Sequence, residues 1–492
     1  MTRESTHDLN ERIRLAMASD PGAAIAEART ILKRSRDSHE RSAVAGILVD
    51  AGELAEDKEA TKTGMVTIQK LVKAAPSDGG LRYMLGTAYL ALARHDKTPR
   101  PQWWEATRKL QIDTRRELWL AAESDIDASI RAQAWINLGN ILDECGRWVE
   151  AYMAYMEALS ASPGHPVAAG WAALMLQRRG GQPGGPNWLP TAHHLARIAQ
   201  SNLKLVAVIA PGAEKYFAKL STDRADDFVR PENAGLKGFD DFVLRNRLYL
   251  SMSLDASHPD CWDSLTTPKL TEAISTPSEP PLLFAMFNTC KADYLLARHL
   301  AWDARNADTD DFHHYVDTLD YARYGNKASL SNLAMRSALD VLDRVAVAAN
   351  QYFGLGQEPK DVYFRSAWRE AVAGEPLRSA AQTEIGEKNR GMLALVSLSD
   401  DFRNDGWLFG RQHLRNIATH RFLIIHEMLL GNWRDAKEIE HISVEDLEEA
   451  TMAALRIARS ALMYLSDAVV QCESRRTPIG VNPSVMLPRL GT

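Results

Sequence analysis

Arg415, Asn416 and His420 are the side chains of this sequence best suited to acid–base chemistry on a phosphate. A neutral histidine can accept the proton of a ribose 2′-hydroxyl, because its reference pKa of about 6.5 lies near neutral pH. An arginine fork can clamp a phosphate and stabilise the charge that builds as the 2′-oxygen attacks. The three residues therefore predict metal-independent RNA cleavage that leaves a 2′,3′-cyclic phosphate and a 5′-hydroxyl.

The spacing of an arginine and a histidine five residues later is not specific by itself. The sequence contains it as Arg34 with His39, Arg415 with His420, and Arg421 with His426. Apolar periodicity over residues 408–430 predicts a helix, and Arg421 falls on its expected core stripe. That stripe consists of Leu414, Ile417, Ala418, Phe422, Ile425 and Met428. Arg415 and His420 fall instead on a polar arc with His413 and Asn416, so this pair is the better candidate.

The predicted helix also constrains how these side chains could meet. Arg415 and His420 would lie about 140° apart around a straight helix, at 100° per residue. Asn416 and His420 are four residues apart, so they share a face and could form a hydrogen bond. The geometry favours a composite pocket, such as one completed by a second copy of the chain at a dimer interface.

Charge near this motif is positive although the whole chain is acidic. The formal net charge is −6, which argues against a general polyanion binder. Between Lys388 and Arg421, six basic residues face three acidic ones, which suits a short RNA substrate. The candidate substrate-binding residues are Arg411, His413, Thr419 and Arg421. Solvated or structural roles are the alternative for Arg411, His413 and Arg421.

Signatures of metal, cofactor or nucleotide chemistry are absent from the sequence. It contains no Walker A loop, no G-x-G-x-x-G after a strand, no H-E-x-x-H and no G-x-S-x-G. The isolated cysteines are Cys145, Cys261, Cys290 and Cys472. We therefore expect no metal and no cofactor, and the few thiols fit a reducing cytoplasm. No signal peptide and no membrane-spanning stretch is recognisable, so we expect a cytoplasmic protein without membrane contact.

The first third of the chain carries a helical repeat. Trp135–Pro163 has the spacing of a tetratricopeptide repeat, in which two antiparallel helices meet at small residues. Gly139 and Ala151 would allow close approach, while Tyr155 would fill the gap beside them. We assign residues 1–180 to a tetratricopeptide-like helical solenoid.

The rest of the chain is also expected to be helical, which makes the fold class all-α. A Gly- and Pro-rich break at 180–186 leads into a connecting region with loops over residues 187–280. Long helical patterns follow at 282–304, 329–353, 408–430 and 444–475 within a helical domain of residues 281–476. Ser443 and Asp446 predict a capping box at the start of the last helix. Residues 477–492 are expected to form a flexible tail.

The run Arg415-Asn416-Ile417-Ala418-Thr419-His420 resembles the R-N-x-x-x-H motif of the HEPN superfamily. Other segments resemble, in order, a HEPN family that is fused to N-terminal tetratricopeptide repeats. Residues 246–250 resemble the stretch that precedes the HEPN domain. Residues 287–298 resemble its first helix, residues 343–353 its second helix, and residues 389–390 the residues that lead into its third helix. The resemblance covers about residues 240–476.

This resemblance implies a HEPN-type helical bundle and a metal-independent endoribonuclease of toxin–antitoxin or anti-phage systems. By the same likeness Arg415 and His420 would be catalytic, Asn416 would orient them, and two copies of the domain would form a homodimer. A protein partner or inhibitor would bind the repeats. Two alternatives stay open: a non-enzymatic scaffold that dimerises through an inactive domain, and a nucleotide-binding module that uses Arg415.

Overall fold

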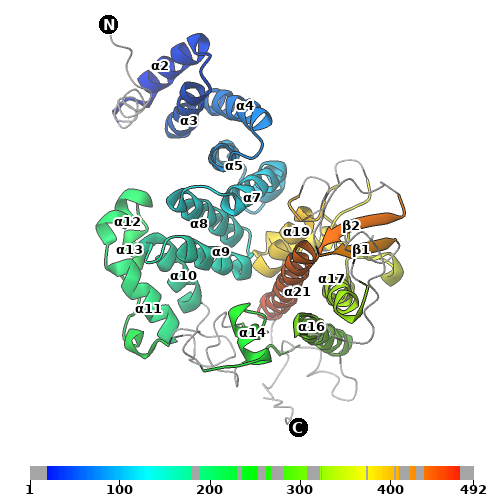
Figure 1. Ribbon diagram of the computed structural model, residues 1–492. Helices are drawn as coiled ribbons and strands as arrows, with labels where there is room; N and C mark the ends of the chain where they lie inside the picture. Colours follow the sequence, from blue (N-terminus) through cyan, green and yellow to red (C-terminus); the bar gives the residue numbers. More distant parts are fainter. Residues whose placement is uncertain are drawn as a thin grey trace.

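The computed structural model describes residues 19–178, 189–229, 235–252, 262–266, 270, 281–306, 322, 324–372, 375–403, 406–408, 421–427 and 437–476. Within these residues a stack of short helices leads into a group of longer helices (Figure 1). The fold class is all-α, as predicted, with one small two-stranded sheet.

The first helices form a stack that we call the helical array. It consists of α2 (Pro21–Arg34), α3 (Ser38–Leu54), α4 (Lys58–Ala74), α5 (Gly79–Arg94), α6 (Trp103–Ala106), α7 (Arg108–Glu123), α8 (Ala128–Glu144), α9 (Trp148–Ala161) and α10 (Pro166–Arg178). Aspartates start many of them by accepting a hydrogen bond from a backbone N–H of the first turn: Asp20, Asp37, Asp57, Asp78 and Asp127. Recurring caps of this kind divide the chain into similar short helices.

The helical pair that was predicted over Trp135–Pro163 is present as α8 and α9. The two helices approach closely because Gly139 has no side chain. A Cβ there would lie 2.5 Å from Cε1 of Tyr155, which is buried against it. Gly86 has the same role in α5, where a Cβ would lie 2.8 Å from Cγ of Leu118 in α7. That these helices are tetratricopeptide repeats stays a prediction.

Short elements continue the chain after the array. They are α11 (Leu189–Gln200), α12 (Leu203–Ile209), α13 (Glu214–Phe217), the 3₁₀ helix η2 (Ala225–Asp227) and α14 (Phe239–Arg245). The ring of Phe217 packs against α10 at Gly170. A Cβ added to Gly170 would lie 2.3 Å from Cε2 of that ring. The described residues between 250 and 281 form no helix or strand, which is consistent with the loops that the sequence predicts within residues 187–280.

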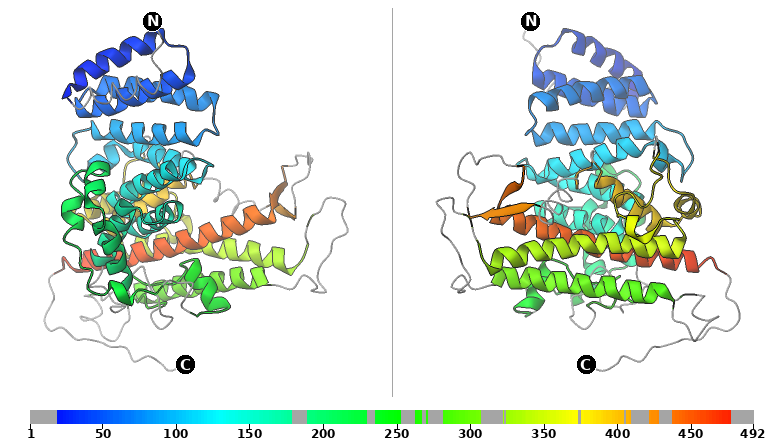
Figure 2. Two further views of the ribbon diagram at one scale, coloured as in Figure 1. Left: turned by 60° about the vertical axis from the view of Figure 1, so that its left-hand side comes forward. Right: turned by 90° about the vertical axis from the view of Figure 1, so that its right-hand side faces the viewer.

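The C-terminal part is built on long helices, which Figure 2 shows side by side. The main ones are α16 (Leu282–Asn306), α17 (Asn326–Phe353), α19 (Arg390–Asp401) and α21 (Val444–Glu473), with the shorter η5 (Pro359–Asp361) and α18 (Ser379–Gly386) between them. The predicted capping interaction is confirmed, since Oγ of Ser443 accepts from the Asp446 N–H at 2.9 Å.

The predicted helix over 408–430 is wrong in its described part. Phe422–His426 forms strand β1, which pairs in parallel with β2 (Ile439–Ser443). Phe422, expected on a core stripe, has 68% of its surface exposed, whereas Ile425 is buried. The run Phe-Leu-Ile-Ile is short and apolar, and such a run is compatible with either a helix or a strand. It forms a strand when a second strand is available for backbone pairing. Here Ile439–Ser443 is that partner.

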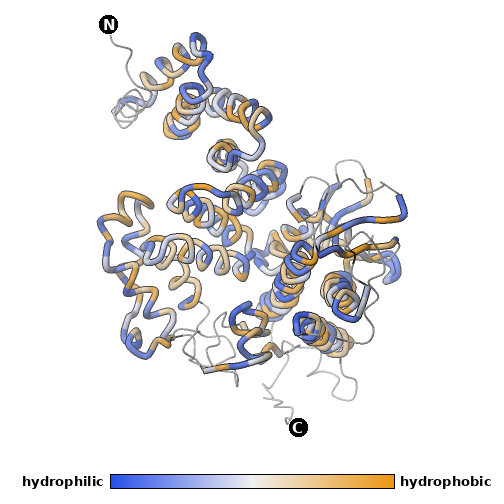
Figure 3. The backbone as a smooth tube through the Cα atoms, in the orientation of Figure 1, coloured by the Kyte–Doolittle hydropathy of each residue, from blue (hydrophilic) through white to orange (hydrophobic). Residues whose placement is uncertain are grey.

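One apolar core joins the later array helices to the C-terminal helices. It includes Leu142 of α8 and Tyr155 of α9 together with Leu342 of α17, Leu395 of α19 and Leu465 of α21. Figure 3 shows hydrophobic and hydrophilic residues alternating around the array helices, as amphipathic helices require. None of the helices in the described ranges is long and apolar enough to cross a membrane.

The turn between α8 and α9 contacts the start of α19. Gly146 in this turn has a φ of +83°, and a Cβ on it would lie 2.3 Å from the carbonyl oxygen of Arg390. Arg390 in turn donates to Oδ1 of Asp143 at 3.0 Å. A residue other than glycine would be excluded here both by its backbone conformation and by its side chain.

Candidate functional site

Most of the predicted site residues lie outside the described residues: Arg411, His413, Arg415, Asn416, Thr419 and His420. Their positions and mutual distances therefore stay predictions. Arg421 is described, with an exposed side chain immediately before β1. The nearest described residues on the two sides of the motif are Leu408 and Arg421.

Leu408 is fixed by the turn that ends α19. Its side chain is buried, and its N–H donates to the carbonyl oxygen of Asp401 at 3.0 Å. Trp407 donates from Nε1 to Oδ2 of Asp401 at 2.7 Å. A Cβ at Gly406 would lie 2.0 Å from the Asp401 carbonyl oxygen, so this turn requires glycine. The chain thus enters the motif region from a defined point at the end of α19.

On the other side the chain leaves the motif through β1. The Phe422 N–H donates to the carbonyl oxygen of Glu438 at 2.9 Å. His426 is fully buried, and its Nε2 lies 2.8 Å from Nδ1 of His441 on β2. Because Arg421 is exposed and His426 is buried, these two residues do not share a surface. The Arg421–His426 pair is therefore not a second candidate catalytic pair.

Asp401 lies at the centre of a buried charge network between the array and α19. Arg115 of α7 donates from Nε and Nη2 to Oδ1 at 3.0 and 2.7 Å. Arg147, just before α9, donates from Nη1 to Oδ2. Burial alone would raise the pKa of Asp401, but the two guanidinium charges outweigh it and hold this pKa below its ordinary value. Asp401 is therefore a buried carboxylate.

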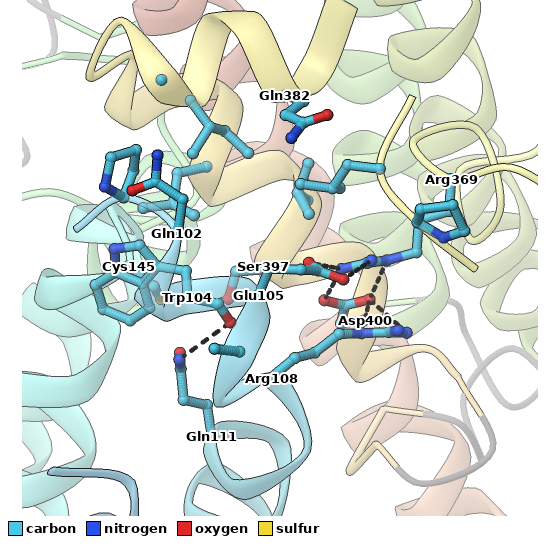
Figure 4. Close-up of a pocket in the computed structure, with 18 of the residues that line it drawn as sticks. Gln102, Trp104, Glu105, Arg108, Gln111, Cys145, Arg369, Gln382, Ser397 and Asp400 are labelled. Atoms are coloured by element: carbon cyan, nitrogen blue, oxygen red, sulfur yellow. Dashed lines mark hydrogen bonds and ion pairs between the residues drawn. The ribbon is translucent and has the colours of Figure 1, made fainter. Parts of the chain in front are cut away.

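Asp400, its neighbour, binds a second pair of arginines. Arg369 donates from Nη2 to Oδ2 at 3.0 Å, and Arg108 donates from Nε to Oδ1 at 3.0 Å. Arg369 also donates from Nη1 to Glu105 at 2.7 Å, which ties it to the array (Figure 4). We call the contacts of Asp400 and Asp401 with these arginines the junction. The junction is not among the sequence-predicted sites, and its one visible signal in the sequence is the pair of adjacent aspartates at the end of an apolar helix.

A cavity of about 470 Å³ opens beside the junction. Figure 4 shows Gln102, Trp104 and Cys145 on one side of it and Arg369, Asp400 and Arg108 on the other. Further apolar lining comes from α18, α19 and the chain before them: Leu377, Ile385, Leu393 and Val396. An apolar cavity with a few converging polar groups, formed where two parts of a protein meet, is typical of a small-molecule site.

A second, larger cleft of about 800 Å³ shares Arg108 and Arg369 with this cavity. Its other basic side chains are Lys109, Arg365, Arg378 and Arg403, and its acidic ones are Asp361, Glu370 and Glu375. Basic residues thus outnumber acidic ones along its wall. The two spaces are adjacent and differ in chemistry, one mainly apolar and one mainly charged.

The described cysteines are buried and poorly reactive. Burial raises the pKa of the Cys290 thiol to about 12, and it also raises the pKa of the Cys145 and Cys472 thiols. Over the described part of the chain, no group of three or more His, Cys, Asp or Glu side chains could hold a metal ion. Asp343 of α17 accepts a hydrogen bond from the Phe364 N–H at 2.8 Å.

Comparison with known proteins gave a match, which lies in the C-terminal part. Residues 274–473 match the family model described as LA2681-like HEPN. This segment contains α16, α17, α19 and α21, the two strands and the Arg415–His420 motif. The C-terminal part is thus similar to a HEPN domain, as the sequence predicts. Neither the curated proteins nor the solved structures gave a match.

Proposed function

We propose that this protein is a metal-independent endoribonuclease whose active site contains Arg415, Asn416 and His420. The observation that carries this proposal is the position of the R-N-x-x-x-H run inside the segment that matches the LA2681-like HEPN family. The family match supports a nuclease-type role, and the motif supplies the groups that cleavage by a 2′-hydroxyl requires.

In the proposed reaction His420 accepts the proton of the ribose 2′-hydroxyl. The 2′-oxygen attacks the adjacent phosphorus, the bond to the 5′-oxygen breaks, and a proton returns to that leaving oxygen. Arg415 binds the phosphate and stabilises the charge that builds on it. Asn416 orients the catalytic pair. Arg411, His413, Thr419 and the exposed Arg421 contact the RNA on either side of the cut.

We further propose that the domain works as a homodimer and that the array regulates it. The junction supports regulation, because arginines of the array bind Asp400 and Asp401 at the end of the helix that leads to the motif. A partner that moved these arginines would move the end of α19. A cytoplasmic toxin or anti-phage effector restrained through its array is the role that fits these features.

Cleavage of single-stranded RNA in the presence of EDTA tests the proposal. We expect the wild-type protein to cut, leaving 2′,3′-cyclic phosphate ends, and His420→Ala to lower the rate about 10²–10⁴-fold, as loss of a general base does. Arg415→Ala should have a similar effect. Arg34→Ala and His39→Ala are matched controls with the same spacing on an exposed part of the array, and both should cut normally.

Two results would contradict the proposal. Equal cutting by wild type and both motif variants would place the activity elsewhere. If the wild type and both variants leave the RNA intact, even with an activating partner present, the scaffold alternative is favoured. The net charge of −6 also supports that alternative. Growth gives a second readout, since expression of wild type should slow it and His420→Ala should relieve the effect.

A further inference from the structure

The apolar cavity and the charged cleft at the junction are chemically complementary to the two halves of a nucleotide. The smaller cavity is lined by Trp104 and by aliphatic side chains, and the cleft beside it is lined by five arginines, a lysine and three carboxylates, so basic groups are in excess there. A nucleotide has a flat aromatic base at one end and anionic phosphates at the other. The volumes of about 470 and 800 Å³ lie in the range of small-ligand sites.

The apolar cavity offers hydrogen-bonding groups for a heterocycle. Gln111 is only 4% exposed, and its amide nitrogen donates to the Thr107 hydroxyl at 2.6 Å and to the Trp104 carbonyl at 3.3 Å. Gln111 is also one of the residues that line the cavity. Gln102 and Gln382 stand at the cavity wall with exposed side chains. Amides of this kind pair with the donors and acceptors on the edge of a base.

The cleft already holds one anionic group between two of its arginines. The Glu375 carboxylate forms ion pairs with Arg403 and, at 3.7 Å, with Arg108. This carboxylate is 41% exposed, and Glu375 has a φ of +43°, a conformation that an L-residue rarely adopts. Arg365, exposed on the same wall, makes no ion pair with any described residue. A phosphate could replace the Glu375 carboxylate and gain Arg365 as well.

We propose that this two-part site binds a free nucleotide, with the base beside Trp104 and the phosphates at Arg108, Arg365 and Arg403. Glu375 then acts as an internal stand-in for the phosphate and leaves when the ligand enters. Because Arg108 and Arg369 also bind Asp400, occupancy of the site would reach the end of α19. The inference concerns a ligand site separate from the motif and does not depend on ribonuclease activity.

Titration calorimetry on the full chain, with EDTA present, tests this site. The probes are the four ribonucleoside triphosphates, with the matching nucleosides and inorganic tripolyphosphate as half-ligands. We expect at least one triphosphate to bind ten-fold or more tightly than its nucleoside and than tripolyphosphate, because only the whole molecule fills both spaces. Failure of all four to bind would overturn the proposal, as would equally tight binding of tripolyphosphate.

Variants with opposite expected effects separate binding from misfolding. Glu375→Gln should tighten triphosphate binding about three-fold or more, since it removes the competing charge. Arg365→Glu should weaken binding five-fold or more, whereas Arg34→Glu, on an exposed part of α2, should leave it unchanged. Ala106→Phe, at an exposed position of the cavity wall, should reduce triphosphate affinity to that of tripolyphosphate.

An oligoribonucleotide distinguishes a free nucleotide from a nucleotide unit of RNA. We expect a ten-residue single strand without terminal phosphates to bind no more tightly through these residues than the nucleosides do. The opposite result is that the strand binds to the wild type but not to Arg365→Glu, while no triphosphate binds. That result would identify an RNA groove and overturn the proposal. Unchanged triphosphate affinity in both Glu375→Gln and Arg365→Glu would overturn it too.

Discussion

The outer and inner halves of the helical array differ in what they pack against. Helices α2 to α4 form small apolar clusters with one another and with α5, such as the one that holds Ile25, Leu48 and Ala60. Helices α7 to α10 share the large core with α17, α19 and α21. The inner half is thus part of the same folded unit as the C-terminal helices, while the outer half extends from it as an arm.

Ion pairs follow the same division. In the outer half Arg94–Glu53 and Lys97–Glu56 are exposed on both sides. At the junction the partners Arg115 and Asp401 are 2% and 0% exposed. Exposed pairs contribute little to stability, whereas a buried charge that loses its partner is costly. Charge therefore specifies how the inner half docks against the C-terminal helices, whereas the exposed pairs of the outer half contribute little to stability.

Removing the central carboxylate should have the largest effect. We expect Asp401→Ala to lower the free energy of unfolding by about 3–5 kcal/mol, because Arg115 and Arg147 would remain buried without their counter-charge. Urea denaturation followed by circular dichroism measures this change. A loss below about 1 kcal/mol would mean that water reaches the junction and that the two halves do not differ in this way.

Overpacking within the inner half should have the next largest effect. Gly139→Val places a side chain against the ring of Tyr155, and we expect a loss of about 1–3 kcal/mol in the free energy of unfolding. Gly386→Val is the matched control, since no atom lies within 4 Å of a Cβ there. Equal thermal melting of the two variants would show that α8 and α9 can separate without cost.

Acid should weaken the junction as Asp401 becomes protonated. The pKa of Asp401 lies below its unfolded value of 3.8, so its stabilising contribution is complete above pH 3.8. That contribution is lost as the pH falls through the lower pKa of the folded state. We expect the difference in unfolding free energy between wild type and Asp401→Asn to shrink from pH 5 to pH 2.5. A constant difference would contradict the linkage.

The smallest effect is expected in the outer half. Glu53→Ala removes the exposed partner of Arg94, and we expect a change in the free energy of unfolding of about 0–1 kcal/mol. The change should become smaller at high salt, because exposed pairs are screened. A loss as large as that of Asp401→Ala, measured by the same urea denaturation, would remove the distinction between the halves.

Local sequence signals predicted much of this fold. The capping pair Ser443–Asp446 and the small residue Gly139 each act within a few residues or one helical pair, so their patterns are visible in a single sequence. The bond between Arg115 and Asp401 joins residues 286 positions apart, and nothing local marks such partners. Strand β1 was missed for the same reason, since its pairing with Ile439–Ser443 decided between helix and strand. The motif at Arg415 and His420 stays a prediction.

The glycine in the turn between α8 and α9 has a mechanical consequence. Gly146 lies in contact with the backbone of Arg390, and α19 is held equally closely to α21 at Gly391, where a Cβ would meet the Ala468 nitrogen at 2.3 Å. Backbones that touch cannot slide, so the chain has no pivot at this point. Helix α5 is held to α7 in a similar way, since a Cβ at Gly86 would lie 2.8 Å from Cγ of Leu118. A side chain in place of the hydrogen at Gly146 or Gly391 would therefore push α19 away from both of its neighbours.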